Sequence, residues 1–270
     1  MIPPMLLRLG LLSLMGSTVG CATPPAAPTE LVDLSLFLFS EFDTADEALF
    51  GEAFVNLELV IEGVLDEERP ERQWELATLR EEHLGGANAP EGEDPDNQVT
   101  MGLARRSEHA VQEHLDIILL TDQSPVDPSA PHYDRTFLLG EDCFAARDCE
   151  RLESVNEITK SNILLEVTYT APKHWRHLTL QDGRQALAGR TWNPDKAVGE
   201  AGANSIDQTY SIDLFLEDPA DPSRSIRFFT LWSAVSLSID ANEALIRSTM
   251  ALGSEGLLKR HDEFLSGETR

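Results

Sequence analysis

Basic residues are scarce in this 270-residue sequence: Lys and Arg number 21 against 47 Asp and Glu, which gives a formal net charge of −26. Proteins that bind nucleic acid need clustered Lys and Arg to replace the counterions of the phosphates. Basic clusters also hold proteins electrostatically on anionic lipid. The charge balance therefore argues against nucleic acid as a partner, and any membrane attachment must come from an apolar anchor.

Local catalytic signatures are also missing. The sequence has no G-x-S-x-G elbow, no HExxH zinc motif and no phosphate-binding glycine loop, and its seven histidines pair with no obvious nucleophile and acid. His109, Glu113 and His114 come nearest to a metal or acid–base group, but no third ligand is nominated. The acidic loop 85–97 lacks EF-hand spacing and is interrupted by two prolines, so we expect a solvated loop there, with calcium binding as the alternative. We expect no metal, no cofactor and no catalytic residue; a hydrolase is the less favoured alternative.

Long apolar runs are missing too, and the apolar stretch near the N-terminus is short. Residues 1–20 contain one charge, Arg8, followed by a few apolar and then small residues. A transmembrane helix needs about 20 apolar residues, so this segment is typical of a signal peptide for export. Residues 21–30 contain CATPPAAP, and proline and alanine without a hydrophobic pattern keep a chain extended, as in a tether.

Residues 17–21 read STVGC, which resembles the lipobox of bacterial lipoproteins. In that family the cysteine, here Cys21, is acylated and becomes the first mature residue. The resemblance implies attachment to a membrane through acyl chains on Cys21, and Ala22 after it implies the outer membrane, on its periplasmic or surface face. Thr18 departs from the family pattern, where leucine usually stands. The alternative is an ordinary signal peptide and a soluble secreted or periplasmic protein.

The other two cysteines are Cys143 and Cys149, within DCFAARDC. An exported chain meets oxidising conditions, so we expect these two to form a local disulfide. A redox pair is more typically separated by two residues, and a zinc site needs further ligands. A helix capped by Asp148 is predicted to follow. Its buried side would hold Leu152, Val155 and Ile158.

Alternating apolar residues between positions 162 and 239 predict an antiparallel sheet. Asp182-Gly183 separates two strand-like runs, and Asp-Gly is a strong hairpin signal because glycine accepts the positive φ of a primed turn. Pro172 is expected to break the run before this hairpin. The five predicted strands cover residues 163–170, 174–180, 184–192, 210–216 and 226–239.

A long amphipathic helix is predicted directly after the sheet, over residues 241–265, with Asp240 or Asn242 as its cap. Gly253 and Gly256 lie inside it; either they allow close approach to the sheet, which we favour, or they mark a break. The remaining predictions are a helix at 45–65 capped by Thr44 or Asp46, a short helix at 74–84, a strand at 99–104, a helix at 108–114, a strand at 117–120, loops at 85–97 and 121–135, and a strand or helix at 31–42.

After the signal peptide (1–20) and the tether (21–30), residues 31–270 are predicted to form one domain, because no second linker changes the composition. The expected fold class is α+β, an antiparallel curved sheet with N-terminal helices and a long C-terminal helix packed on it. This order resembles the helix-grip of START-type lipid-binding domains. Four segments, CFAARDC, RLESVNEITKSN, DGRQALAGRTW and QTYSIDLFL, resemble an uncharacterised group of bacterial surface lipoproteins, which implies no activity.

The function favoured by these observations is non-catalytic binding of an apolar or amphipathic small molecule, in a cavity between the sheet and the closing helix, by a lipid-anchored protein of the cell envelope. The alternative is an accessory or scaffold component of an envelope assembly, with a protein partner bound at exposed apolar patches. Large aromatic residues of the sheet are candidates to line such a pocket, and for each the ordinary alternative is the core. They are Tyr169, Trp175, Trp192, Tyr210 and Trp232.

Overall fold

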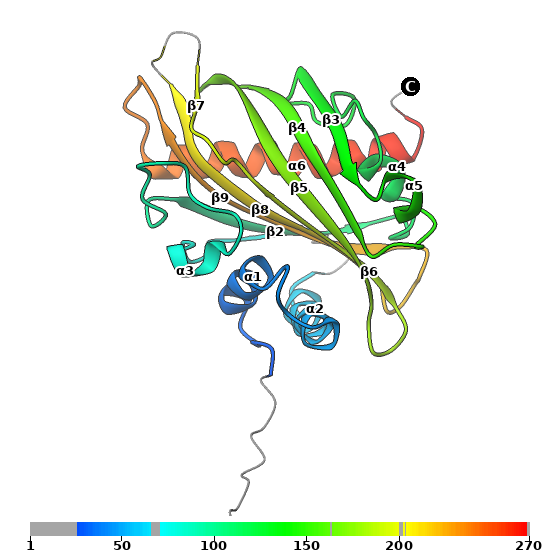
Figure 1. Ribbon diagram of the computed structural model, residues 1–270. Helices are drawn as coiled ribbons and strands as arrows, with labels where there is room; N and C mark the ends of the chain where they lie inside the picture. Colours follow the sequence, from blue (N-terminus) through cyan, green and yellow to red (C-terminus); the bar gives the residue numbers. More distant parts are fainter. Residues whose placement is uncertain (1–25, 66–70, 163, 200–201, 203, 269–270) are drawn as a thin grey trace, which may run out of the picture.

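The computed structural model of the protein describes residues 26–65, 71–162, 164–199, 202 and 204–268. In this part of the chain, six helices accompany one sheet of nine strands (Figure 1). The helices are α1 (Leu31–Ser40), α2 (Glu47–Glu62), α3 (Glu81–Leu84), α4 (Leu115–Ile118), α5 (Glu141–Phe144) and α6 (Glu243–Leu265). The strands are β1 (Glu71–Trp74), β2 (Val99–Ser107), β3 (His132–Leu139), β4 (Arg151–Ser161), β5 (Glu166–Thr179), β6 (Gln185–Trp192), β7 (Ala197–Val198), β8 (Ser205–Glu217) and β9 (Ser225–Ser236).

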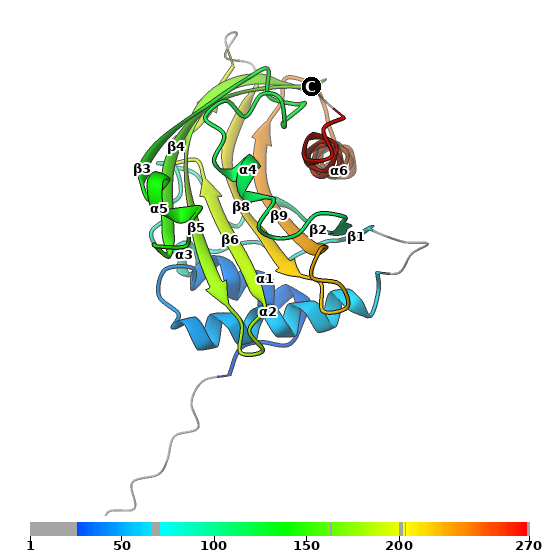
Figure 2. The ribbon, with the colours of Figure 1, turned by 90° about the vertical axis from the view of Figure 1, so that its right-hand side faces the viewer.

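The strands are antiparallel and follow the order β1-β2-β9-β8-β6-β5-β4-β3, with β7 paired to β8. The sheet is strongly curved. Figure 2, in which α6 is seen nearly end-on, shows this helix inside the curve, while α1 and α2 cover the opposite face. The predicted fold class, a curved antiparallel sheet with N-terminal helices and a long C-terminal helix packed on it, is therefore confirmed.

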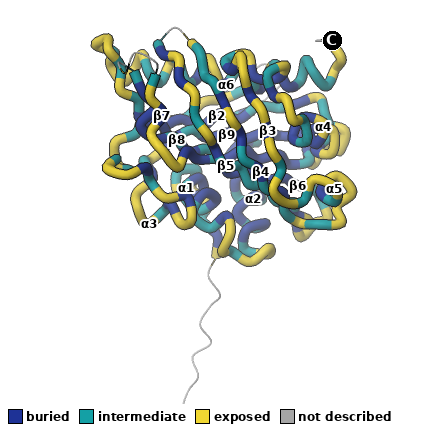
Figure 3. Tube along the Cα trace, turned by 45° about the horizontal axis from the view of Figure 1, so that its top comes forward, coloured by how far each residue is buried: buried dark blue, intermediate teal, exposed yellow. Residues whose placement is uncertain are grey.

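The largest hydrophobic core lies between the sheet and the helices α1 and α2. The ring of Phe39 in α1 packs edge-on against Tyr210 of β8 and Trp232 of β9, at 5.7 Å and 5.6 Å between centroids. Figure 3 shows α1, α2 and the central strands largely buried, with exposed residues concentrated in the loops and on β3, the strand at one end of the sheet. Successive strand residues point to opposite faces, so every second residue of β8 and β9 points toward α6 instead of this core.

Two predicted helices begin at their expected caps. The Asp46 side chain accepts a hydrogen bond of 2.8 Å from the backbone N–H of Leu49 at the start of α2. At the start of α6, Asn242 accepts one of 2.9 Å from Leu245. Both are the usual N-cap arrangement, in which a short polar side chain satisfies a free backbone donor of the first turn.

The glycines of α6 do not have the predicted role. The helix runs without a break through Gly253 and Gly256. A Cβ added at Gly253 would meet nothing within 4 Å, and one at Gly256 would meet only the Cγ of Pro128, at 4.0 Å. The prediction that these glycines allow close approach to the sheet is wrong, because the space beside Gly253 is open.

The predicted break at Pro172 is also wrong, since β5 continues through it. Pro172 is paired with Val155 of β4, whereas the ladder from β5 to β6 begins only at Lys173. At Pro172 one side of β5 therefore has no neighbouring strand, and proline is tolerated in a strand where its missing N–H faces such a side. The hairpin at Asp182-Gly183 is confirmed, with Gly183 at a φ of 89°.

Strand β4 replaces the helix predicted after Asp148. It pairs with β3 and β5 along its length, and every second residue is buried: Leu152, Ser154, Asn156 and Ile158. Other predictions that fail are the strand at 117–120, which is helix α4, the helix at 108–114, which is a series of turns, and the loop at 121–135, which includes the start of β3. Residues 74–84 hold the end of β1 and the single turn α3 in place of one helix.

The predicted signal peptide and Cys21 lie outside the described residues. The described chain starts beneath α1 and α2, on the side away from α6 (Figure 1). Among the helices of the described residues, none is long and apolar enough to cross a membrane.

Candidate functional site

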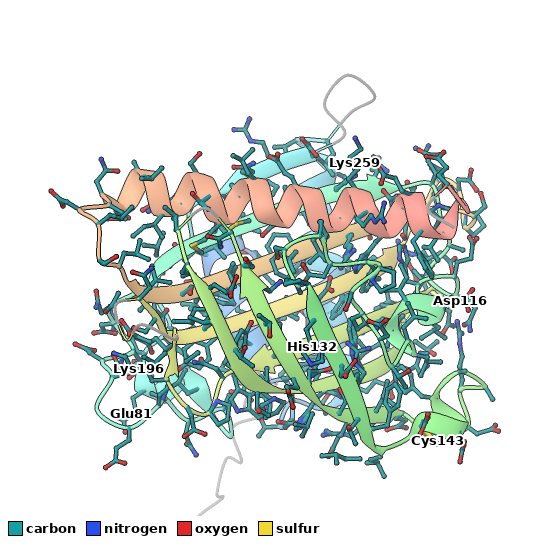
Figure 4. The ribbon with its side chains drawn as sticks, turned by 90° about the horizontal axis from the view of Figure 1, so that it is seen from above. Glu81, Asp116, His132, Cys143, Lys196 and Lys259 are labelled. Carbon is teal, nitrogen blue, oxygen red and sulfur yellow. A yellow bond between two sulfur atoms is a disulfide. The ribbon has the colours of Figure 1, made fainter. Side chains whose placement is uncertain are left out.

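A cavity of about 270 Å³ lies between the curved face of the sheet and α6. Strands β4, β5, β6, β8 and β9 form its walls together with α6 and the loop that precedes β3. Seen from above (Figure 4), α6 on one side and β4 and β5 on the other stand over β8 and β9. This is the place where the order of the elements in the sequence predicts a cavity.

Helix α6 gives the cavity an apolar wall. Ile246, Met250 and Leu257 line it from one face of the helix, and Phe229 of β9 adds an aromatic ring. Gly253 also lines the cavity, and it lies on the same face because it follows Met250 by three residues and precedes Leu257 by four. The missing side chain at Gly253 therefore contributes to the open space in front of the helix.

The sheet contributes a row of polar groups. Lys173 of β5 is directly opposite Thr191 of β6, and Thr191 is directly opposite Ser211 of β8. Opposite residues in antiparallel strands point to the same face, with Cβ atoms about 4.5–5.5 Å apart, and all three side chains line the cavity. In the described part of the protein, the Oγ1 atom of Thr191 is buried without a hydrogen-bond partner.

The Lys173 side chain is enclosed by protein, yet it keeps accessible surface because it faces the cavity. Its Nζ atom lies 4.4 Å from the centroid of the Trp175 ring. Burial lowers the pKa of the Lys173 ammonium group to about 7; Arg135 and Arg227 also lower it, while Asp213 raises it. Near neutral pH this side chain therefore exchanges between a neutral amine and an ammonium ion.

A buried ion pair lies at one end of the cavity. Arg227 donates to the Asp213 carboxylate from Nε at 2.8 Å and from Nη2 at 2.7 Å. Its Nη1 donates to Nδ1 of His261 at 2.7 Å, because arginine has no acceptor. Burial first, and then the positive charge of Arg227, hold the pKa of His261 well below its usual value. His261 is therefore neutral, with Nδ1 as an acceptor.

The second carboxylate at the cavity is paired as well. Asp127 binds the ammonium group of Lys160 and accepts a hydrogen bond of 2.7 Å from the Ser129 hydroxyl. Burial alone would raise the pKa of Asp127, but Lys160 and Ser129 together bring it below its usual value. Both carboxylates that line the cavity among the described residues are thus paired with cations.

Two of the five predicted pocket residues border the cavity. Tyr169 of β5 lines it, and burial raises the pKa of its phenol above the usual value. Tyr210 borders it as well, but its ring packs against Phe39 on the face that carries α1. Of the two, Tyr169 is the residue whose side chain lies on the cavity face.

The structure packs the three predicted tryptophans into cores. Trp192 and Trp232 belong to the core beneath the sheet; Thr191, the neighbour of Trp192, lines the cavity, so Trp192 points the other way. Trp175 shares the cavity face with Lys173, but its ring lies over Gly189, where a Cβ would come within 2.5 Å of it. Gly189 thus lets the indole lie flat on the sheet.

His109, Glu113 and His114 do not form one site. Nδ1 of His109 lies 3.4 Å from the Glu113 carboxylate, whereas His114 is buried with Nε2 3.0 Å from the Ser225 hydroxyl. Within the described ranges, no group of three or more His, Cys, Asp or Glu side chains is placed to hold a metal ion.

The predicted disulfide between Cys143 and Cys149 is confirmed, with 5.5 Å between the Cα atoms. It joins the short helix α5 to the residues just before β4, in place of a helix entry. Figure 4, which labels Cys143, shows the bridge at the edge of the molecule, on the other side from α6.

A search of protein-family models found no match to this chain, and a search of curated proteins found none. Solved structures with a similar arrangement were found. A STAR-related lipid transfer protein from Xanthomonas axonopodis is 13% identical with a TM-score of 0.46, covering 75% of this chain and 97% of that one. An aromatase/cyclase from Streptomyces sp. R1128 is 10% identical with a TM-score of 0.41, covering 64% and 96%. A START superfamily protein from Mycobacterium smegmatis is 9% identical with a TM-score of 0.40, covering 63% and 99%. At these values the similarity concerns the fold and carries no argument about activity.

Sequence reasoning missed the polar row of Lys173, Thr191 and Ser211. The sequence contains one signal for it. Lys173 lies two residues from both Ala171 and Trp175, so its side chain is on the same, largely apolar face of the strand. The pairing that brings the three together depends on the register of β5, β6 and β8, and the sequence gives no direct evidence of that register.

Proposed function

We propose that the protein binds a small amphipathic ligand, without catalysis, in the cavity between the sheet and α6. The observation that carries this proposal is the combination of an apolar wall on α6 and β9 with a row of polar side chains on β5, β6 and β8, in which the Oγ1 atom of Thr191 has no hydrogen-bond partner among the described residues. Ligand pockets have this composition, mostly apolar with a few placed polar groups. The volume of about 270 Å³ is just below the range of such pockets, roughly 300–1,000 Å³, so one alkyl chain or a small ring system fits better than a diacyl lipid.

The two carboxylates and the histidine at the cavity are already engaged by other side chains. A general base must be free to accept a proton from the substrate or from water. Asp213 and Asp127 are each held by a cation, and Nδ1 of His261 already accepts from Arg227. These groups therefore stabilise the walls of the cavity.

The test replaces Gly253 by leucine. The new side chain would project from the middle of the apolar face of α6 into the cavity, where a Cβ has open space. Titration with the neutral fluorophore phenylnaphthylamine should show one saturable site in the native protein and at least about tenfold weaker binding in Gly253→Leu. Folding should be kept, because glycine is about 1 kcal/mol less favourable than alanine inside a helix.

The matched control is Ser248→Leu, which adds the same side chain at an exposed position of α6 that does not line the cavity. It should bind the fluorophore as the native protein does. Equal binding by Gly253→Leu and the native protein, or equal weakening by both variants, would contradict a ligand site in the cavity.

We also propose that the protein is anchored in the outer membrane through acyl chains on Cys21. The short apolar segment before STVGC supports this, as does the start of the described chain on the side away from α6, which would leave the ligand site clear of an anchor (Figure 1). The mass of the full-length protein, purified from the membranes of its host, should lack residues 1–20 and include acyl groups. An unacylated mass would instead indicate a secreted or periplasmic protein.

The second candidate function, a component of an envelope protein assembly, is favoured by one surface feature. Leu138 and Leu139 are 63% and 53% exposed and are adjacent on β3, the last strand in the sheet order. The unpaired backbone N–H and C=O groups of an edge strand can pair with a strand of another chain, and exposed apolar side chains favour that contact. Replacing both leucines by lysine should release a co-purifying partner in this case, and should leave binding of the fluorophore unchanged.

A further inference from the structure

The unpaired charge in the cavity indicates which polar group the ligand carries. Resting on the proposed function, we propose that the ligand is an amphipathic carboxylic acid whose carboxylate is bound by Lys173, Thr191 and Ser211 while its apolar part lies against α6. These three side chains stand in one row across adjacent strands and face the cavity. They place one ammonium group and two hydroxyl donors within reach of a single anionic group.

The carboxylates that line the cavity are already paired. Within the described residues, Asp213 is paired with Arg227, and Asp127 with Lys160, so neither carboxylate is left for Lys173. The nearest named contact of the Lys173 Nζ atom is the Trp175 ring, which stabilises a cation but accepts no conventional hydrogen bond. An ammonium group has three donors and no acceptor, and buried charges are normally paired. The missing counter-ion is therefore expected from the ligand.

The two hydroxyls fit the same occupant. Thr191 has its Oγ1 atom buried without a partner in the described part of the chain, and a buried polar atom without a partner is rare in native proteins. A carboxylate has two oxygens that only accept, so it can take hydrogen bonds from the ammonium group and from both hydroxyls. A cationic head group would instead bring a second positive charge beside Lys173.

The net charge of −26 does not prevent an anion from binding. Most of the acidic residues are exposed, and exposed charges more than about 10 Å apart are screened by salt. Lys173 lies inside the protein, where screening is weaker, and Arg135, buried on β3 and bonded to Asn156 at 2.8 Å, adds a second positive charge on this side. The local field at the polar row is therefore positive.

Binding should depend on pH through Lys173. The protonated form binds a carboxylate, and burial places the pKa of this group at about 7, so decanoate should bind more tightly as the pH falls from about 9 to about 6. The other charged or titratable groups that face Lys173 are held in ion pairs, bonded to a neutral side chain, or neutral. They are Asp213 on β8, Arg227 on β9, Arg135 on β3, Asp127 in the loop before β3 and the neutral His261 on α6.

The experiment compares decanoate, decanol and decylamine by calorimetric titration of the full chain at about pH 6.5. Charge-assisted hydrogen bonds predict that the native protein binds decanoate roughly 10- to 100-fold more tightly than decanol, and decylamine more weakly than decanol. Lys173→Met should remove the preference for decanoate while still binding decanol. Lys259→Met, at an exposed lysine of α6, should behave like the native protein.

Each outcome decides between the two proposals. Equal affinity for decanoate and decanol in the native protein, or a preference for decanoate that survives in Lys173→Met, would overturn the carboxylate inference but leave an apolar ligand site. Failure of all three probes to bind, with Gly253→Leu also without effect on the fluorophore, would refute the proposed function itself. Thr191→Val gives an independent check: this substitution should weaken the binding of decanoate and leave the binding of decanol unchanged.

Discussion

Replacing Lys173 by methionine should make the protein more stable, although the substitution removes a charged residue. Methionine has a similar length and no charge, and its thioether packs well beside an aromatic ring such as Trp175. The native amine is enclosed in the protein with no carboxylate partner among the described residues. Burial without a partner destabilises the charged form, so the folded state carries an energetic cost that methionine would remove.

The size of the effect follows from the pKa. Burial lowers the pKa of Lys173 from 10.5 to about 7, and each unit corresponds to about 1.4 kcal/mol. Well below pH 7 the full shift would therefore reduce the free energy of unfolding by almost 5 kcal/mol, and at pH 7 by slightly less. Water in a cavity of about 270 Å³ can solvate part of the charge, so we expect Lys173→Met to gain roughly 2–4 kcal/mol.

The pH dependence gives the sharper test. Between about pH 7 and pH 10.5 the unfolded chain holds a proton on this lysine that the folded protein lacks, so native stability rises with pH in this range. Lys173→Met lacks this contribution. Urea unfolding of both proteins should therefore show a gap that is largest at or below about pH 7 and closes toward pH 10. A constant gap across this range, or a variant less stable than the native protein, would refute the argument that Lys173 is buried and unpaired.

Three further substitutions or treatments test other parts of the fold. Arg227→Met should lower the free energy of unfolding in urea by about 3–5 kcal/mol, because it leaves the Asp213 carboxylate buried without its partner; adding Asp213→Asn should recover part of the loss, and full additivity would contradict the pairing. Gly189→Ala should destabilise by about 1–3 kcal/mol, because its Cβ would come within 2.5 Å of the Trp175 ring; Gly86→Ala, which has open space around it, is the control for thermal unfolding. Reduction of the disulfide should cost about 2 kcal/mol from the entropy of its small loop, so an unfolding midpoint that does not respond to reductant would contradict this contribution.

The elements that could be predicted from the sequence have their signals in a few adjacent residues. Asp46 and Asn242 each cap a helix through a side-chain bond to the third residue that follows. Asp182-Gly183 forms a turn whose positive φ only glycine adopts readily. Such signals do not depend on the rest of the fold, so the two long helices and the hairpin were correctly placed.

Strand β4 was missed because its buried face is partly polar. Leu152 and Ile158 are buried, but so are Ser154 and Asn156 between them, and these polar residues hide the two-residue period. Asn156 is satisfied inside the protein: it donates to the carbonyl of Ala171 at 2.8 Å and accepts from Arg135 at 2.8 Å. Only the neighbouring strands supply these partners, and they are not evident from the local sequence. The remaining apolar residues, Leu152, Val155 and Ile158, have the three-residue spacing of a helix, so the segment was predicted to be one.

The candidate site was predicted in position and missed in chemistry. The order of strands and closing helix predicts a cavity between them, and Tyr169 lines it. The size of the tryptophans makes them candidates for a pocket, but successive strand residues point to opposite faces, and Trp192 and Trp232 face α1 and α2. The polar row depends on the pairing of β5, β6 and β8. The open space depends on Gly253, which has no side chain and so adds nothing to a hydrophobic pattern.

The two faces of the sheet differ in how completely they are packed. Phe39, Tyr210 and Trp232 belong to a large, closely packed core beneath the sheet, and dense packing of this kind supplies most of the stability of a fold. The face that carries α6 is less completely packed. Gly253 stands where an apolar side chain would fill the space, and the unpaired ammonium group of Lys173 lowers the stability of the fold. Local features that oppose stability are expected at functional sites. Because α1 and α2 stabilise the sheet from the other side, the cavity can remain open without loss of the fold, as the proposed binding function requires.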